Sequence, residues 1–122
     1  MLNQFSRTEL LLGKEGIEKL QNAKVAIFGL GGVGSFVVEV LVRAGIENFV
    51  LIDDDKICLT NLNRQIIATR KTIGKYKVDV AKERILEINP NANVETYQEF
   101  FMPNSKSQII TEDLSYVIDC ID

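Results

Sequence analysis

Short apolar runs separated by a helical pattern predict an alternating α/β chain. Val25–Phe28 and Phe49–Ile52 are continuous apolar runs rich in β-branched residues, which is typical of strands buried on both faces. Between them, apolar residues recur at helical spacing over Val33–Ala44, and Gly45 is a stop signal. This order of strand, helix and strand predicts a βαβ unit with a parallel sheet.

The other predicted elements alternate in the same way. They are two short helical segments over residues 8–12 and 15–20, a helix that opens at Lys77 and ends at Asn89, and strands over residues 93–97 and 116–120. The residues after Asp55 have no clean period, so we expect a loop with one helical turn over Leu62–Ala68. The fold class that follows is α/β: a Rossmann-like, mostly parallel sheet with helices on both faces.

The composition is that of one globular domain. The chain has 122 residues, of which 46% are hydrophobic and 25% charged, with a net charge of −3. This charge argues against a surface that binds nucleic acid all over, but it leaves room for a local basic patch. No apolar run approaches the roughly 20 residues of a membrane span, and the first residues lack the apolar core of a signal peptide. We therefore expect a cytoplasmic protein that does not bind membranes.

A glycine-rich turn joins the first strand to the following helix. Gly29, Gly31 and Gly34 form a G-x-G-x-x-G motif with an additional Gly32. The first glycine allows a tight turn, the second lets the backbone approach a phosphate, and the last lets helix and strand pack closely. The helix start offers unpaired N–H groups and a partial positive charge, which suit an anion. Asp53 ends the second strand, where a carboxylate can accept hydrogen bonds from ribose hydroxyls.

Basic residues gather after this motif. Half of the 14 lysines and arginines lie between Arg64 and Arg84. Lysine and arginine are mostly exposed, so a solvated basic face is the plain interpretation. Lys77 is the best candidate for meeting phosphates, because it opens a helix whose positive end points the same way.

Histidine is absent, so the commonest general base and metal ligand is missing from this chain. Cys58 and Cys120 cannot form a structural zinc site unaided, and we interpret them as small, buried or half-buried side chains rather than as catalytic thiols. Any reaction here therefore rests on carboxylates, arginine, lysine and backbone amides.

Taken together, the motifs resemble those of the ThiF/MoeB/HesA family, the bacterial relatives of ubiquitin-activating enzymes. They keep their order over nearly the whole chain and comprise Gly29–Gly34, Asp53, the segment Thr60-Asn61-Leu62-Asn63-Arg64-Gln65, Lys77 and Asp119–Asp122. The resemblance implies that residues 1–122 are an ATP-binding Rossmann-like domain, the N-terminal part of a ThiF-type fold. It also implies ATP and Mg²⁺ as cofactors, and adenylation of a carboxylate with release of pyrophosphate.

The resemblance further implies roles for individual residues in nucleotide binding. Gly32 approaches the phosphates, together with the other glycines of the turn, and Asp53 holds the ribose. Asn61, Arg64 and Lys77 contact the triphosphate. Such fixed cations stabilise the charge that builds on phosphate oxygens when a carboxylate attacks the α-phosphate.

Two implied roles concern the metal and the partner subunit. Asp122 holds Mg²⁺, and an arginine near the N-terminus reaches into the partner subunit's site. Arg7 is at about the right place for that arginine. The implied catalytic set is therefore Arg64, Lys77, Asp122 and Arg7, acting in a homodimer.

Three details are most similar to the branch of tRNA threonylcarbamoyladenosine dehydratases: the segment of residues 5–13, the turn Arg43–Ile46 and the T-N-x-N-R-Q form. This branch implies an ATP-dependent cyclisation on tRNA. Sulfur-carrier activators more typically show D-L-S-N-L-Q-R-Q where this chain has Cys58–Gln65, a departure that favours the tRNA branch.

Three alternatives of other kinds stay open. The first is adenylation of a ubiquitin-like sulfur-carrier protein, with such a carrier or a cysteine desulfurase as partner. The second is an NAD-binding oxidoreductase domain, because the glycine motif alone does not select the nucleotide. The third is a non-catalytic dimerisation or scaffold domain, which would not bind ATP.

Overall fold

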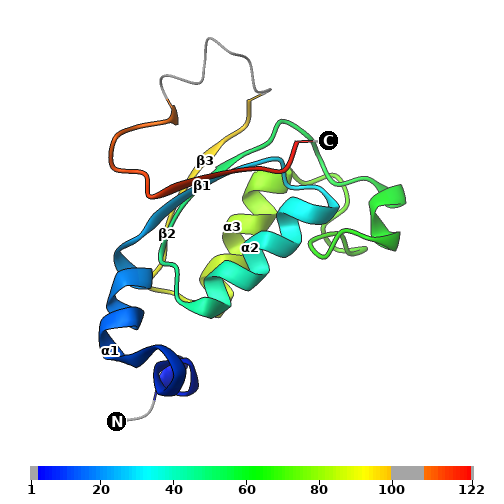
Figure 1. The fold of residues 1–122 in the computed structure, drawn as a ribbon. Coiled ribbons are helices and arrows are strands. Elements are labelled where there is room, and N and C mark those ends of the chain that lie inside the picture. The colour runs from blue at the N-terminus through cyan, green and yellow to red at the C-terminus, as the bar shows by residue number, and fades with distance from the viewer. Residues whose placement is uncertain (1–2, 100–108, 122) are drawn as a thin grey trace.

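The computed structural model describes residues 3–99 and 109–121. Its elements alternate between helices and strands (Figure 1), in the order α1 (Ser6–Asn22), β1 (Lys24–Phe28), α2 (Gly32–Ala44), β2 (Asn48–Ile52), the 3₁₀ helix η1 (Leu59–Asn63), α3 (Lys77–Ile88), β3 (Asn93–Tyr97) and β4 (Tyr116–Asp119). This order confirms the predicted α/β class. The strands and the helices α2 and α3 begin and end within a few residues of the predicted positions.

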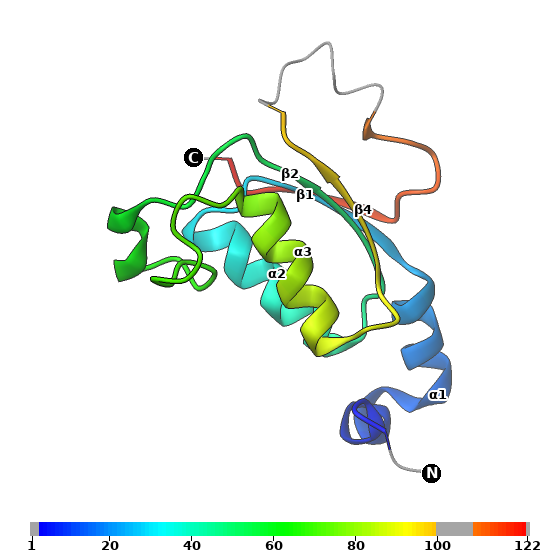
Figure 2. The same cartoon turned by 180° about the vertical axis from the view of Figure 1, so that it is seen from behind.

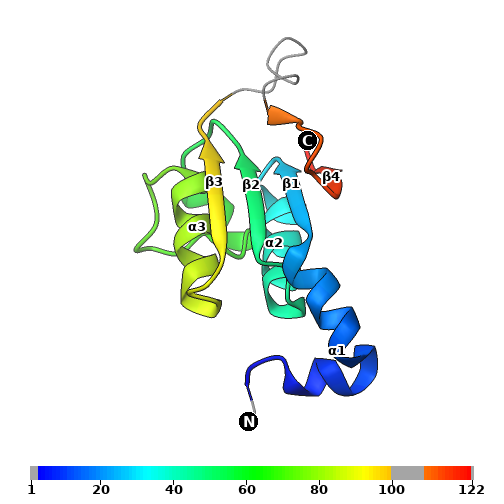
Figure 3. The same ribbon diagram turned by 90° about the vertical axis from the view of Figure 1, so that its left-hand side faces the viewer.

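The four strands form one parallel sheet in the order β3-β2-β1-β4. Figure 3 shows the strands side by side, with their carboxyl ends at one edge. From β1 the chain moves to β2 and β3, and it then returns to β4 on the other side of β1. The strand order therefore reverses between β1 and β4. In open α/β sheets, ligands bind outside the carboxyl ends of the strands at such a point.

Alternate side chains of each strand pack on opposite faces of the sheet. One face buries Ile27 of β1 and Leu51 of β2 against α2 and α3, and Figures 1 and 2 show both helices on the same side of the sheet. The other face buries Phe28 and Ile52, with Ile109 packed against them. The predicted fold class has helices on both faces, whereas the described helices α2 and α3 both cover the first face.

Two local features differ from the sequence-based expectation or refine it. The two short N-terminal helical segments join into α1, which bends at Gly13, where φ is 75°. After β2, the helical turn covers Leu59–Asn63, so the predicted turn over Leu62–Ala68 is wrong. The cause is a side chain: Asn61 Oδ1 accepts the N–H of Cys58 at 2.8 Å, which starts the turn earlier.

Helix α1 contacts the core through Leu20 at its C-terminal end and then projects from the sheet. It extends away from the amino-terminal ends of the strands, at the opposite end of the sheet from their carboxyl ends (Figure 3). None of the helices in the described residues combines the length and the apolar character that crossing a bilayer requires.

A buried carboxylate connects the two helices that cover the sheet. Glu39 of α2 accepts hydrogen bonds from Nε of Arg84 on α3 at 2.9 Å and from Nε of Arg43 at 2.6 Å. The hydrogen bond from Arg84 is the largest cause that lowers the pKa of Glu39, and Arg43 acts in the same direction against the opposing effect of burial. The folded protein therefore favours the charged form of Glu39.

Glu39→Gln should destabilise the protein at neutral pH by about 2 kcal/mol, because two arginines lose their shared carboxylate. The pKa of Glu39 is lower in the folded than in the unfolded chain, so its contribution is complete above the ordinary value of 4.5 and disappears as the pH falls through the folded pKa. Urea unfolding at neutral and acidic pH measures this: the wild type should lose more stability on acidification than the variant. Glu83→Gln, at an exposed position of α3, is the control. An equally steep acid loss in Glu39→Gln would contradict the assignment.

Candidate nucleotide-binding site

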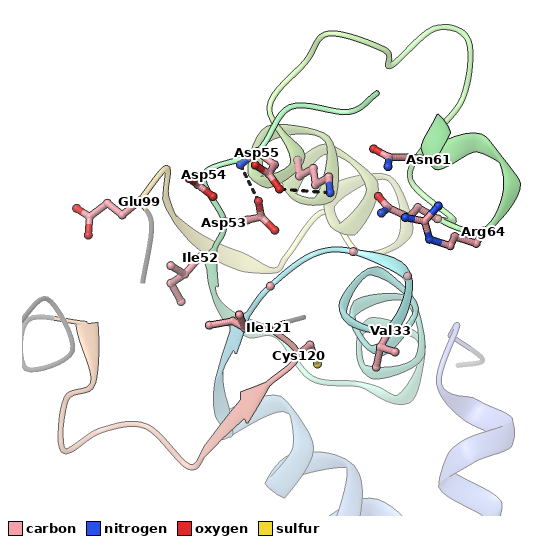
Figure 4. Close-up of a pocket in the computed structure, with 15 residues that line it drawn as sticks. Val33, Ile52, Asp53, Asp54, Asp55, Asn61, Arg64, Glu99, Cys120 and Ile121 are labelled. Carbon is pink, nitrogen blue, oxygen red and sulfur yellow. Dashed lines mark hydrogen bonds and ion pairs between the residues drawn. The ribbon is translucent and has the colours of Figure 1, made fainter. Parts of the chain in front are cut away.

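A pocket of about 720 Å³ opens at the carboxyl edge of the sheet (Figure 4). This volume is in the range of sites that enclose small-molecule ligands. Seven residues that the sequence predicts as site residues line it: Gly29, Gly31, Gly32, Asp53, Asn61, Arg64 and Lys77. They come from the turn before α2, the end of β2, the η1 loop and the start of α3. The fold therefore brings together residues that are far apart in the sequence.

Close packing determines the shape of the glycine turn at two positions. Gly29 has a φ of 93°, and a Cβ there would lie 2.6 Å from the carbonyl oxygen of Cys120. A Cβ at Gly34 would lie 1.7 Å from the carbonyl oxygen of Gly29, so neither position has room for a side chain. The nearest protein atom to such a Cβ would be 3.6 Å away at Gly31 and 3.9 Å away at Gly32. The protein's own packing therefore leaves space for a methyl group at these last two positions.

Asp53 connects the end of β2 to the glycine turn. Its Oδ2 accepts the N–H of Leu30 at 2.7 Å, and its Oδ1 accepts the N–H of Asp55 at 2.7 Å. A carboxylate oxygen has more than one acceptor position, so both oxygens can still accept a hydrogen bond from a ligand hydroxyl. Figure 4 shows Asp53 beside Asp54 and Asp55, whose carboxylates each offer an oxygen within 4.8 Å of the others.

Two cationic side chains line the pocket. Lys77 is the first residue of α3, and its side chain is only 7% exposed. Its Nζ lies 4.0 Å from Asp55 Oδ2, which is longer than a hydrogen bond. Arg64 is exposed, and its Nη1 donates to the carbonyl oxygen of Thr60 at 3.2 Å and to Asn63 Oδ1 at 2.9 Å. The lysine is thus buried beside an aspartate, whereas the arginine is folded back on its own loop.

Asn61 supports the loop that carries Arg64. Its side chain is buried, and its Oδ1 is already used to cap the N–H of Cys58. Asn61 therefore both lines the pocket and fixes the path of the η1 loop.

Two predicted site residues in the described part of the chain do not line this pocket. Gly34 is buried behind the turn, where its role is close packing. Arg7 is exposed on α1, at the opposite end of the sheet, so it does not reach the pocket of its own chain. Asp122, the predicted metal ligand, lies outside the described residues.

The pocket also contains residues to which the sequence assigned no role. Gln65 follows Arg64 and is only 6% exposed. It belongs to the T-N-x-N-R-Q segment, but its burial depends on the tertiary path of the loop, which no local pattern encodes. Glu99 and Ile121 line the pocket from the ends of other chain segments.

The prediction of buried or half-buried cysteines is confirmed for Cys120 and is wrong for Cys58. Both are free, and Cys58 is exposed. Burial is the main cause that raises the pKa of the Cys120 thiol, and the charge of Asp119 adds to it. A raised pKa disfavours the thiolate, which is the reactive form.

Comparison with known proteins assigns the family. A model of the ThiF family matches residues 5–122. The chain belongs to the ThiF family. Among curated ThiF relatives, the tRNA threonylcarbamoyladenosine dehydratase of Bacillus subtilis (strain 168) is 47% identical over 122 residues, which is 100% of this chain and 48% of the relative. That of Escherichia coli (strain K12) is 41% identical over 98% of this chain and 44% of the relative. The chain thus spans about half the length of the curated relatives it matches.

Solved structures with more than 30% sequence identity have the same fold. The E. coli tRNA N6-threonylcarbamoyladenosine dehydratase, TcdA, in complex with ATP superposes with a TM-score of 0.95 at 41% identity, covering 98% of this chain and 49% of that one. The E. coli protein MccB with ATP has a TM-score of 0.82 at 33% identity, covering 95% of this chain and 36% of that one. Both similarities include the sheet and the glycine turn, since they cover nearly all of this chain.

Two substitutions at the glycine turn should separate packing from ligand contact. Gly34→Ala should destabilise the protein by about 3 kcal/mol, because the methyl group overlaps the carbonyl oxygen of Gly29. Gly32→Ala should leave stability nearly unchanged, since its Cβ meets no close protein atom and alanine is favoured in a helix. Thermal unfolding of both variants measures this. Equal stability losses for the two would show that the packing account of the turn is wrong.

Proposed function

We propose that this protein catalyses the ATP-dependent cyclisation of threonylcarbamoyladenosine in tRNA. The threonyl carboxylate attacks the α-phosphate of ATP, and pyrophosphate leaves. The carbamoyl group of the same modified nucleoside then attacks the activated carbonyl carbon, and AMP leaves with one carboxylate oxygen. The nucleoside loses one water overall. The observation that carries the proposal is that one pocket is lined by Gly32, Asp53, Arg64 and Lys77. The choice of substrate is supported by the 47% identity to the tRNA threonylcarbamoyladenosine dehydratase of Bacillus subtilis.

ATP fits the geometry of this pocket. The turn at Gly31 and Gly32 leaves its backbone accessible, and the first turn of α2 has N–H groups without intrahelical partners. These groups bind the phosphates in our proposal, while Asp53 accepts hydrogen bonds from the ribose. The ATP complex of the similar TcdA supports the choice of nucleotide.

The two cations favour ATP over NAD. Lys77 and Arg64 flank the glycine turn, where they can stabilise the negative charge that builds on the α-phosphate and on departing pyrophosphate. Hydride transfer from a nicotinamide does not require two cations at this position. Lys77 has the greater effect in our proposal, because a buried charge is screened less by water than the exposed Arg64.

Mg²⁺ also fits the residues at the pocket. Carboxylate oxygens are the protein ligands that Mg²⁺ prefers, and those of Asp53, Asp54 and Asp55 gather at one side of the pocket. We propose that Asp122, which follows β4, holds the ion, and that these aspartates adjoin it. When bound, the ion neutralises phosphate charge.

We further propose that the protein is a homodimer in which Arg7 acts at the partner subunit's site. Val33, Phe36 and Val40 form an exposed apolar stripe along α2, and Leu10 and Leu11 are exposed on α1. Apolar residues clustered in this way are typical of a protein interface. Sedimentation of the full-length protein checks the assembly, and a monomer at micromolar concentration would contradict it.

A sulfur-carrier activator is the second candidate, since the UBA4 adenylyltransferase and sulfurtransferase of Vanderwaltozyma polyspora is 37% identical over 90% of this chain. In that case a sulfur-carrier protein or a cysteine desulfurase would be the partner. Both candidates consume ATP in the cytoplasm, which is the location we propose.

The test uses the full-length protein with ATP, Mg²⁺ and tRNA that bears threonylcarbamoyladenosine. The tRNA is digested and its nucleosides are weighed; we expect an ATP-dependent loss of one water. Lys77→Ala and Arg64→Ala should abolish this conversion, because the charge on the phosphates loses its fixed counter-charge. Lys82→Ala, an exposed lysine further along α3, and Arg70→Ala are the matched controls and should retain it.

The outcomes separate the candidates. No mass change, together with pyrophosphate release on addition of a sulfur-carrier protein, would replace the dehydratase by the carrier activator. NAD binding that survives both substitutions would favour an oxidoreductase domain, and absence of any ATP binding would favour a scaffold. Wild-type turnover in Lys77→Ala or Arg64→Ala, with folding verified by circular dichroism, would overturn the site assignment.

A further inference from the structure

Gln65 carries a polar group that the described residues do not satisfy. The residue is 6% exposed, and its Oε1 is buried without a hydrogen-bond partner among the described residues. It is the one side-chain atom of this kind in the described part of the chain. Buried polar atoms are nearly always paired, so an unpaired one in a pocket wall points to a partner beyond the described residues.

The position of Gln65 is fixed by its backbone. Its N–H donates to the carbonyl oxygen of Asn61 at 2.9 Å, and its own carbonyl oxygen accepts the N–H of Ala68 at 3.0 Å. The neighbouring Ile67 and Ala68 are buried in the hydrophobic core. The backbone of Gln65 is therefore held at the pocket wall by hydrogen bonds and by the core residues that follow it.

The amide of Gln65 faces the part of the glycine turn that has open space. Its Nε2 is the protein atom nearest to a Cβ built on Gly31, at 3.6 Å. A phosphate bound at this turn presents only acceptor oxygens, so the amide can serve it only by donating from Nε2. The Oε1 then points away from the phosphate and needs an O–H donor.

We propose that Gln65 is a further nucleotide-binding residue, whose amide Nε2 donates to a phosphate oxygen at Gly31 and whose Oε1 is paired by an O–H donor of the hydrated nucleotide. This inference rests on the proposed function, because it needs ATP in the pocket. Gln65 is neutral, so its hydrogen bond orients the phosphate, whereas Arg64 and Lys77 supply the positive charge. An unpaired buried polar group lowers the stability of the nucleotide-free protein, and nucleotide binding removes this free-energy cost.

The test measures ATP affinity and nucleotide-free stability in the full-length protein. Gln65→Met keeps the size of the side chain but has no polar amide. It should weaken ATP binding about tenfold or more, because a hydrogen bond to a charged group is lost, and should leave the unfolding temperature without nucleotide equal or higher. Gln65→Glu keeps an acceptor but cannot donate, and its charge repels phosphate, so it should weaken binding further. Gln21→Met, on α1 away from the pocket, is the control for both measurements.

The outcomes distinguish this inference from the proposed function. No ATP binding by the wild type in titration calorimetry would overturn both. ATP binding by the wild type that Gln65→Met retains would overturn the inference alone. A lower unfolding temperature of Gln65→Met with unchanged ATP affinity would assign Gln65 a purely structural role and would also overturn it. ATP affinity retained in Gln65→Glu would exclude donation to a phosphate.

Discussion

The carbonyl oxygen of Gly29 lies so close to Gly34 that Gly34 has no room for a side chain, and the rest of the site depends on this contact. It lets α2 begin directly above the end of β1, so the first N–H groups of the helix face the carboxyl edge of the sheet. The carbonyl oxygen of Cys120 closes the turn from the β4 side, and Asp53 fixes it from the β2 side through the N–H of Leu30. Three strands therefore hold one glycine turn.

The parallel topology then concentrates positive potential at the same edge. Every helix that returns to a parallel sheet begins near the carboxyl ends of the strands, so the positive ends of α2 and α3 point toward one pocket. Lys77 adds a buried charge at the start of α3, and the η1 loop adds Arg64. Acidic residues at the end of β2 balance these cations. This arrangement suits a ligand with several negative charges, and it explains why a sheet edge of an acidic protein can bind triphosphate in our proposal.

Periodicity and glycine chemistry predicted most of the fold, because strands such as Val25–Phe28 and the start of α3 at Lys77 are encoded locally. The same holds for Asp53 and the glycine turn of the site. Two features could not be predicted in this way. The 3₁₀ turn at Leu59–Asn63 depends on a single side-chain cap by Asn61. The burial of the unpaired Oε1 of Gln65 depends on how the loop packs against the core. The first is a local side-chain hydrogen bond, which hydrophobic periodicity does not register, and the second arises from tertiary contacts.

The central claim is that the threonyl carboxylate attacks the α-phosphate of ATP. The most direct measurement uses tRNA whose threonylcarbamoyladenosine carries ¹⁸O in both carboxylate oxygens, converted by the full-length protein with ATP and Mg²⁺. Because the acyl carbon–oxygen bond breaks when AMP leaves, one labelled oxygen should appear in AMP, and mass spectrometry should find none in pyrophosphate. Label in inorganic phosphate together with ADP, or in water alone, would contradict adenylation.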